Sequence, residues 1–364
     1  DAASETGPFV IVPSASGQPA QSANAVREIL IRYGVASERI EIAKLAVRDD
    51  RSTPGVDEAD WQANADDPET VDLLNRAAAI WFTGGDQSRT TRLLLSAQAQ
   101  PTPALTAIRR ARAKGASIGG TSAGAAIMSD PMITQGDTLP TLTGSDMGER
   151  LEMGPGLDFF EPGLVDQHFG ERARLGRLAM ALMQLPEPDA RLGFGIDEDT
   201  ALIASPKGPL SVKGNSYVTV LDARQAKLET LPTGAAKITN LTVHLIASGD
   251  VLASETLALA PANWKAATIG NEYVDTPAPG GGGMAVPGQS LADVIGEGLI
   301  DNKQSQRIER ISFDGNGDGV AYVFTQLPAS RGYWGRGPDG EGRYAIANVR
   351  FDIVPVRLSI ETLK

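Results

Sequence analysis

The chain has 364 residues, 41% hydrophobic and 21% charged, which is typical of a folded globular protein of about two domains. Its 33 Lys and Arg against 45 Asp and Glu give a net charge of -12, so we expect no nucleic-acid partner, because the overall field repels a polyanion. The absence of cysteine and the presence of only two histidines exclude disulfides, thiol nucleophiles and a polyhistidine zinc site, and no hydrophobic run predicts a membrane span.

Helices and strands alternate over about the first two hundred residues. Asp67-Pro68-Glu69 has the capping residue, first-turn proline and acidic residue of a helix start. Strands are predicted at residues 9–12, 40–47, 79–82, 116–118 and 192–203, and helices at residues 20–33, 88–96, 105–114, 125–128 and 171–185. This order predicts an α/β fold with a mostly parallel sheet flanked by helices on both faces.

The pattern changes after about residue 205. Strand-like runs joined by polar turns follow at residues 217–221, 238–246, 319–325 and 344–355. Residues 276–283 read TPAPGGGG, which is typical of a loop or linker. We therefore expect an α/β core with a β continuation over residues 1–259, and a Gly/Pro-rich loop with a β-rich extension over residues 260–364.

The first candidate for chemistry is Gly120-Thr121-Ser122-Ala123-Gly124, a G-x-S-x-G match between a predicted strand and a predicted helix. Small neighbours let a tight turn expose the serine hydroxyl, and the helix N-terminus favours a developing oxyanion. Ser122 is therefore a predicted nucleophile. A glycine-rich turn without chemistry gives the same letters and stays the alternative.

A second turn, Thr83-Gly84-Gly85-Asp86-Gln87, also follows a predicted strand. In a parallel sheet both turns lie at the carboxyl ends of their strands, where sites collect. We expect the N–H groups of Gly85 and Ala123 to form an oxyanion hole, and Gln87 to orient a substrate. Asp86 is alternatively explained as a helix N-cap.

A serine nucleophile needs a base held by a carboxylate, and only His168 and His244 are available. His168 is preferred because it lies at a loop-to-helix junction, whereas His244 lies inside an alternating strand. Acidic residues cluster at residues 197–199, where Glu198 is the candidate partner. The chain order Ser-acid-His, with His244 as base, keeps an α/β-hydrolase-type esterase as an alternative.

Four blocks together resemble the cyanophycinase family, serine peptidases on the class I glutamine amidotransferase-like fold. They are residues 82–87, residues 120–125, Asp166-Gln167-His168-Phe169 with the arginines that follow, and residues 195–201. The resemblance implies Ser122 as nucleophile, His168 as base and Glu198 as its orienting acid, with no cofactor. It also implies that the substrate is cyanophycin, a poly-aspartate backbone carrying arginine on its β-carboxyl groups, which is cut to β-Asp-Arg dipeptides.

The resemblance also suggests substrate contacts. Arginine forks suit carboxylates, and carboxylates suit guanidinium groups. The predicted contacts are Arg172, Arg174, Arg177 and Gln167 on the helix block, and Asp86, Asp166, Asp197 and Asp199 for the substrate arginine. The alternative for the arginines is surface solvation or ion pairing with Glu171. A protein that holds an Arg- or Asp-rich polymer without cleaving it is the non-catalytic alternative.

The extension holds one further motif. Asp314, Asn316 and Asp318 match the first half of a calcium loop, but its twelfth position is Thr325, and a hairpin turn gives the same letters. The length of the extension resembles exported members of the family, and the sequence starts without Met. We therefore expect a secreted or periplasmic protein, with a cytoplasmic one as the alternative, and a possible homodimer.

Overall fold

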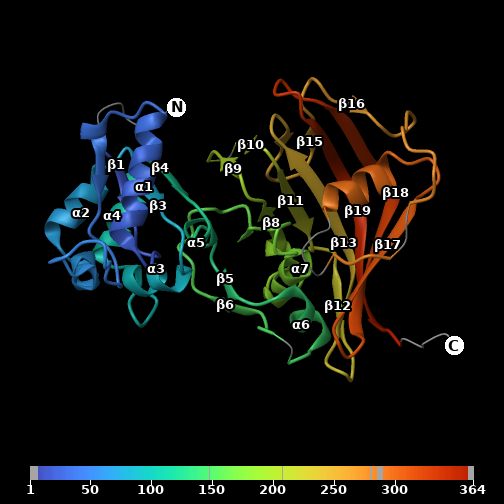
Figure 1. The fold of residues 1–364 in the computed structure, drawn as a ribbon, viewed down its shortest axis with the longest axis horizontal. Coiled ribbons are helices and arrows are strands. Elements are labelled where there is room, and N and C mark those ends of the chain that lie inside the picture. Colours follow the sequence, from blue (N-terminus) through green and yellow to red (C-terminus); the bar gives the residue numbers. More distant parts are fainter. Residues whose placement is uncertain (1–6, 147, 207, 279–280, 285–289, 360–364) are drawn as a thin grey trace. The chain divides into compact units, whose positions relative to one another are not determined.

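The computed structural model describes residues 7–359 apart from residues 147, 207, 279–280 and 285–289. The chain divides into two compact units: unit 1 holds Asp1–Thr134 and Gly154–Glu161, and unit 2 holds Gln135–Met153 and Pro162–Lys364 (Figure 1). The chain passes from one unit to the other within β5 (Met132–Gln135), within β6 (Glu152–Gly154) and after Glu161; β5 and β6 form a two-stranded sheet.

Unit 1 is an α/β layer structure around a four-stranded sheet of order β2-β1-β3-β4, in which every pair is parallel. Its strands are β1 (Phe9–Val12), β2 (Ile40–Ile42), β3 (Ala79–Phe82) and β4 (Ser117–Gly120). Its helices are α1 (Pro19–Arg32), η1 (Ser37–Arg39), η2 (Glu58–Ala65), α2 (Pro68–Asn75), α3 (Gln87–Leu94), α4 (Pro103–Ala113) and α5 (Ala123–Ala126).

The two faces of this sheet bury different helices. Successive strand residues point to opposite faces. On β1, Ile11 packs with Ala23 of α1, whereas Val10 and Val12 belong to a separate cluster that contains Leu74 of α2 and Ile108 of α4. Helices therefore cover both faces, and the predicted parallel sheet flanked by helices is confirmed.

Unit 2 is rich in β-structure. A nine-stranded sheet runs β16-β18-β19-β13-β11-β8-β7, with β12 paired to β13 and β17 to β18, and a second sheet runs β15-β14-β10-β9. The strands are β7 (Leu164–Gln167), β8 (Leu192–Ile196), β9 (Thr200–Ala204), β10 (Leu210–Gly214), β11 (Tyr217–Asp222), β12 (Lys227–Thr230), β13 (Ala236–Ala247), β14 (Val251–Leu252), β15 (Leu259–Ala260), β16 (Ala266–Ala267), β17 (Arg307–Phe313), β18 (Asp318–Arg336) and β19 (Gly342–Arg357). The helices are α6 (Thr138–Thr143), α7 (Leu175–Gln184), η3 (Pro188–Ala190) and the π-helical η4 (Asp293–Ile300).

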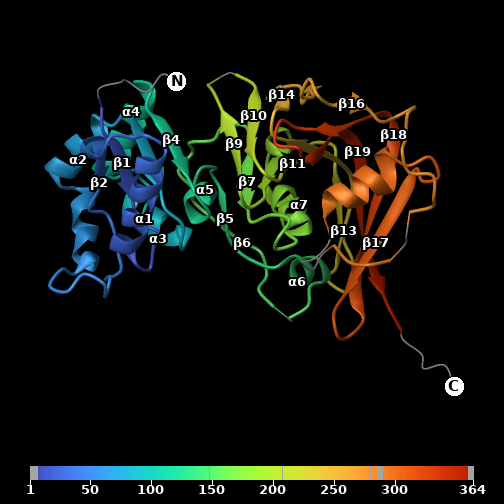
Figure 2. The same cartoon turned by 45° about the horizontal axis from the view of Figure 1, so that its top comes forward.

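The extension completes this sheet rather than standing apart from it. β13 pairs with β11 on one side and with β19 on the other, and β18 lies beside β19 (Figure 2). The rings of Phe324 and Phe351 stack with centroids 4.7 Å apart in the buried layer. Tyr322 of β18 reaches α7, where a Cβ added to Gly176 would lie 2.2 Å from its hydroxyl oxygen. The β-rich extension is thereby confirmed, whereas the expected division between residues 259 and 260 falls within β15, inside unit 2.

Among the boundaries that differ from the sequence prediction, two lie next to the candidate base and acid. The helix expected over residues 171–185 begins only at Leu175, because residues 168–174 form turns in which His168 and Ala173 have positive φ. The strand expected over residues 192–203 is broken into β8 and β9 by a turn that contains Glu198. Both errors fall on the segments that carry the candidate base and acid.

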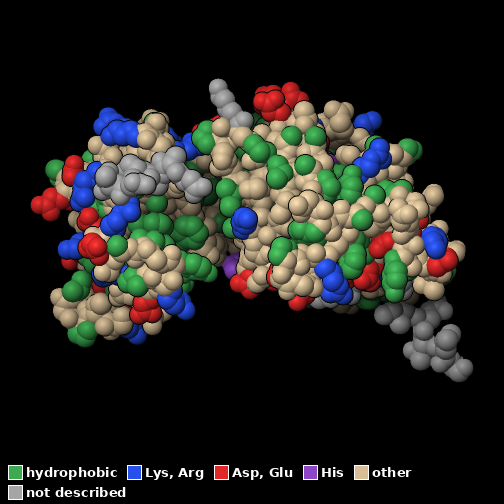
Figure 3. All heavy atoms as spheres, turned by 90° about the horizontal axis from the view of Figure 1, so that it is seen from above, with side chains coloured by type: hydrophobic (Ala, Val, Ile, Leu, Met, Phe, Trp, Pro, Cys, Tyr) green, Lys and Arg blue, Asp and Glu red, His purple; other side chains and the backbone are tan. Residues whose placement is uncertain are grey.

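The surface of each unit carries charges of both signs. On the face drawn in Figure 3, Lys and Arg side chains of the described residues lie singly among acidic and hydrophobic ones and form no continuous basic stripe. Within the described part of the chain, no helix has both the length and the apolar character needed to cross a membrane. The absence of a nucleic-acid partner and the location outside the cytoplasm stay predictions.

Candidate catalytic site

Ser122 occupies the turn between β4 and α5 in unit 1. Its φ of 52° and ψ of -113° lie where L-residues are rarely found. The turn is closed by the Gly124 N–H, which donates to the Thr121 carbonyl at 2.8 Å. A Cβ on Gly124 would lie 2.3 Å from the Phe82 carbonyl oxygen, so only glycine lets β3 and α5 approach this closely. Backbone crowding around one strained serine therefore explains the final glycine of G-x-S-x-G.

The second glycine turn lies beside this serine. A Cβ built on Gly84 would be 3.2 Å from the Ser122 Cβ. Gly85 has a φ of 140°, and a side chain there would meet the Ala15 carbonyl oxygen at 2.1 Å. Ala123 is the first residue of α5, where helix N–H groups have no partner within the helix. The two backbone segments predicted to hold an oxyanion thus both border the serine, and their role stays a prediction.

The side chains of Asp86 and Gln87 have partners within unit 1. Asp86 is the N-cap of α3 and accepts from the Ser88 N–H at 2.9 Å, as its alternative explanation predicted. The Gln87 amide nitrogen donates to the carbonyls of Ile133 and Thr134 at 2.9 and 2.8 Å. The predicted substrate contact through this amide nitrogen is therefore replaced by a bond that attaches α3 to β5.

His168 and Glu198 meet in unit 2. They follow the neighbouring strands β7 and β8, which pair in parallel with Gln167 opposite Ile196, so both turns emerge at the same edge of the sheet. The His168 Nδ1 lies 2.6 Å from Glu198 Oε1. An ionised carboxylate only accepts hydrogen bonds, so we infer that Nδ1 carries the proton and Nε2 the lone pair. This is the orientation in which an imidazole acts as a base through Nε2.

The arginines expected to hold substrate divide into two groups. Arg177 is 4% exposed and forms a two-point ion pair with Asp166, through Nε at 3.0 Å and Nη2 at 2.5 Å, while its Nη1 donates to the Gly136 carbonyl at 2.7 Å. Arg174 donates to the Gln167 carbonyl and lies 3.5 Å from the same carboxylate; burial lowers its pKa to about 10. Asp166 and Arg177 are therefore internal partners, which corrects their assignment as substrate contacts.

Two further predicted contacts lie on either side of His168 in the sequence. Arg172 is exposed and immediately follows Glu171 in the turn after His168. Gln167 is half-buried, and its Oε1 has no hydrogen-bond partner among the described residues. Arg172 is therefore open to a substrate, as are the exposed side chains of Asp86 and Asp199, whereas the Gln167 Oε1 is buried.

The second histidine lies in the interior. His244 is 2% exposed within β13, opposite Val220 of β11. Burial lowers its pKa to about 4, and its Nδ1 has no partner among the residues that the structure describes. A base must reach the proton that it removes. The geometry of unit 2 therefore disfavours the esterase alternative that relies on His244.

The calcium motif lies in the hairpin between β17 and β18. The Asp314 Oδ1 accepts from the backbone N–H groups of Asn316 and Asp318 at 2.8 and 3.2 Å, and the Asp314 N–H donates to the Asp318 carbonyl at 2.9 Å. These bonds account for the Asp-Gly-Asn-Gly-Asp sequence as a turn. No group of three or more His, Cys, Asp and Glu side chains arranged for a metal is found in the described part of the chain.

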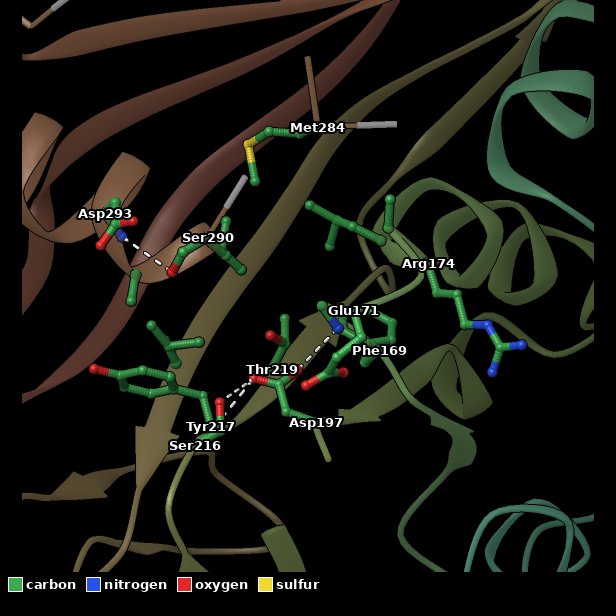
Figure 4. Close-up of a pocket in the computed structure, with 16 residues that line it drawn as sticks. Phe169, Glu171, Arg174, Asp197, Ser216, Tyr217, Thr219, Met284, Ser290 and Asp293 are labelled. Carbon is green, nitrogen blue, oxygen red and sulfur yellow. Dashed lines mark hydrogen bonds between the residues drawn. The ribbon is translucent and has the colours of Figure 1, made fainter. Parts of the chain in front are cut away.

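A cavity of about 400 Å³ adjoins the base turn within unit 2. Figure 4 shows Phe169, Glu171 and Asp197 on one side of it and Met284 and Asp293 of the extension on the other, while the Arg174 side chain is directed away. Sequence reasoning missed this cavity, because nothing local marks residues 284 and 293 as neighbours of residue 197.

Comparison with known proteins identifies the family to which the chain is similar. The family model for peptidase family S51 matches residues 6–208. Cyanophycinases from Synechococcus elongatus and Thermosynechococcus vestitus are each 34% identical over 245 residues, covering 66% of this chain and 67% of theirs, and one from Nostoc is 32% identical over 247 residues, covering 66% and 74%. Among solved structures, a peptidase from an acI-B1 actinobacterium is similar at 22% identity with a TM-score of 0.42, over 67% of this chain and 82% of that one.

These matches define the class of protein as a serine-type peptidase. The chain belongs to peptidase family S51. The matched segment contains Ser122, His168 and Glu198, whereas the extension lies outside it.

Proposed function

We propose that this chain hydrolyses cyanophycin, the arginine-bearing aspartate polymer, to β-Asp-Arg dipeptides through Ser122, His168 and Glu198. The substrate follows from the cyanophycinases that it resembles. The observation that carries the catalytic assignment is the 2.6 Å contact between His168 Nδ1 and Glu198 Oε1, because it orients the imidazole as a base.

In the proposed cycle, His168 Nε2 removes the proton from Ser122 Oγ as that oxygen attacks an aspartyl carbonyl of the polymer backbone. Glu198 stabilises the imidazolium that forms. The N–H groups of Gly85 and Ala123 hold the oxyanion. His168 then gives its proton to the leaving amine, and water hydrolyses the acyl-enzyme with His168 again as base. The cycle requires Ser122 Oγ and His168 Nε2 to come within hydrogen-bond reach in the active enzyme.

Two side chains that lie on either side of His168 in the sequence are assigned to substrate binding. Arg172 is a candidate to hold a substrate carboxylate by two-point contact, and Gln167 is a candidate to bind the polymer backbone next to the reacting carbonyl. No step of the cycle calls for a cofactor.

The test is dipeptide release from cyanophycin by wild type, Ser122→Ala, His168→Ala and His244→Ala, with hydrolysis of a simple ester alongside. We expect the first two variants to lose dipeptide release and His244→Ala to retain it wherever it remains folded. Ester cleavage without dipeptide release would favour the esterase. Tight binding of the polymer without products would favour a binding protein.

A further inference from the structure

Two acidic side chains beside the proposed catalytic pair have no part in the cycle above. Asp197 directly precedes Glu198, and Glu171 lies three residues after His168. Each carboxylate crosses from its own turn to the turn of the other. The Asp197 Oδ1 accepts from the Gly170 N–H at 2.9 Å, and the Glu171 Oε1 accepts from the Glu198 N–H at 3.0 Å.

Asp197 is also attached to the strand behind it. Its Oδ2 accepts from the Ser216 hydroxyl at 2.7 Å and from the Tyr217 N–H at 3.3 Å, at the start of β11. Burial raises the pKa of Asp197, because it removes water from the carboxylate. The hydrogen bonds that the carboxylate accepts offset part of this cost. Both oxygens accept hydrogen bonds within unit 2, and the expectation that Asp197 holds the substrate arginine stays a prediction (Figure 4).

The catalytic pair needs such support. The His168 side chain is 23% exposed and that of Glu198 is 53% exposed, and both project from turns rather than from regular structure. A side-chain hydrogen bond this accessible contributes at most about 1 kcal/mol, which does not immobilise two turns by itself. The reciprocal backbone bonds from Asp197 and Glu171 join the two turns on either side of the pair.

We propose that Asp197 and Glu171 are positioning residues that hold the His168 and Glu198 turns in register, so that the Nδ1–Oε1 hydrogen bond forms before substrate arrives. This inference rests on the proposed roles of His168 and Glu198. Neither residue is a catalytic residue, because each acts through a backbone N–H of the opposite turn.

The competing interpretation is that Glu171 and Asp197 attract a cationic substrate by charge. Charge and hydrogen bonding are separated by amide variants. Glu171→Gln removes the charge but keeps an acceptor for the Glu198 N–H, whereas Glu171→Ala removes both. Asp197→Asn keeps an acceptor for Gly170 but presents N–H donors where the Tyr217 N–H already points, so it restores only part of the network.

The first readout is steady-state kinetics on cyanophycin. We expect kcat to fall about 10-fold in Glu171→Ala and about 100-fold in Asp197→Ala with KM nearly unchanged, because a misplaced base slows the reaction without weakening binding. Glu171→Gln should stay within about 3-fold of wild type, and Asp197→Asn should lie between wild type and Asp197→Ala. Glu187→Gln, an exposed acid of the same unit, is the charge control and should behave as wild type.

The second readout needs no substrate. A short Nδ1–H bond to a carboxylate gives a far-downfield proton resonance, and with two histidines in the chain it is assigned by its loss in His168→Asn. We expect this resonance to broaden or vanish in Glu171→Ala and Asp197→Ala, and to persist in Glu171→Gln and Glu187→Gln. Thermal unfolding of each variant identifies any that fails to fold, in which case the amide variant decides.

Several results would overturn the proposal. They are a Glu171→Gln variant as slow as Glu171→Ala, a rise in KM at unchanged kcat, and a resonance that survives in both alanine variants. Absence of the resonance from wild type, or full activity of Ser122→Ala, would instead overturn the proposed function.

Discussion

The turn around Ser122 in unit 1 is shaped by backbone, whereas the turns around His168 and Glu198 in unit 2 are held by side chains. In unit 1, glycines let β3, β4 and α5 approach so closely that any side chain would collide with a carbonyl oxygen. In unit 2, the carboxylates of Asp166, Glu171 and Asp197 accept hydrogen bonds from backbone N–H groups and from an arginine that lie far from them in the sequence. Steric crowding restricts the backbone conformation at Ser122. The conformation of the His168 and Glu198 turns depends instead on each hydrogen-bond partner separately.

The largest loss of activity should come from removing the side chains through which the two regions are proposed to act together. Ser122→Ala and His168→Ala should each lower kcat about 10⁴-fold, and the double variant should lose little more, because groups that act as a unit are not additive. Dipeptide release from cyanophycin measures all three. If the fold-loss of kcat in the double variant equals the product of the two single losses, the two turns do not serve one proton transfer.

Arg177→Met tests the side-chain network. It leaves the buried Asp166 carboxylate without its two-point partner, so we expect the free energy of unfolding to fall by about 3–5 kcal/mol. Urea unfolding measures the loss. Arg172→Met is the matched control, because Arg172 is exposed and its removal should cost less than about 0.5 kcal/mol. Equal effects in the two variants would contradict the ion pair.

Acid should weaken unit 2 through His244. Its folded pKa of about 4 lies below the unfolded value of 6.5, so the unfolded state binds more protons between these values and stability is lost as pH falls from 6.5 to 4. The shift amounts to about 3 kcal/mol. His244→Leu should remove this pH dependence. Above pH 7, its free energy of unfolding should change with pH in the same way as that of wild type. Hydrogen exchange should show the loss in β13 and not in β1, since unit 1 contains no histidine.

Gly124→Ala tests the crowded turn and should give the smallest change in stability. The added methyl would lie 2.3 Å from the Phe82 carbonyl oxygen, and relief of such overpacking costs about 1–3 kcal/mol. Gly315→Ala is the control, because a Cβ added there would point into open space, with nothing within 4 Å beyond its chain neighbours. Thermal unfolding compares the two, and an unperturbed Gly124→Ala would mean that the turn is not shaped by packing.

The same comparison explains what the sequence could predict. The Ser122 turn, the Gly84–Gly85 turn and the Asp67 cap each carry a local sequence pattern, and each was predictable from that pattern. The parallel sheet of unit 1 followed from the alternation of strands and helices.

The rest depended on pairing across distance. Arg174 and Arg177 looked like an exposed helix face, and only the position of β7 shows that both point at Asp166. The helix after His168 was expected four residues too early, because the positive φ values of His168 and Ala173 arise from tertiary bonds rather than local propensity. The roles of Glu171 and Asp197 had no local signal beyond their adjacency to the candidate pair.

The contact of Tyr322 with α7 bears on whether the extension can be removed from this chain. Tyr322 lies on a strand of the extension, outside the segment matched by the family model, yet its fully buried ring rests on the helix that follows the candidate base. Removing the extension after residue 259 would uncover the edge of β13 that pairs with β19 and would take Tyr322 away from that helix. In this chain, the extension is part of the structure that supports the helix after the candidate base.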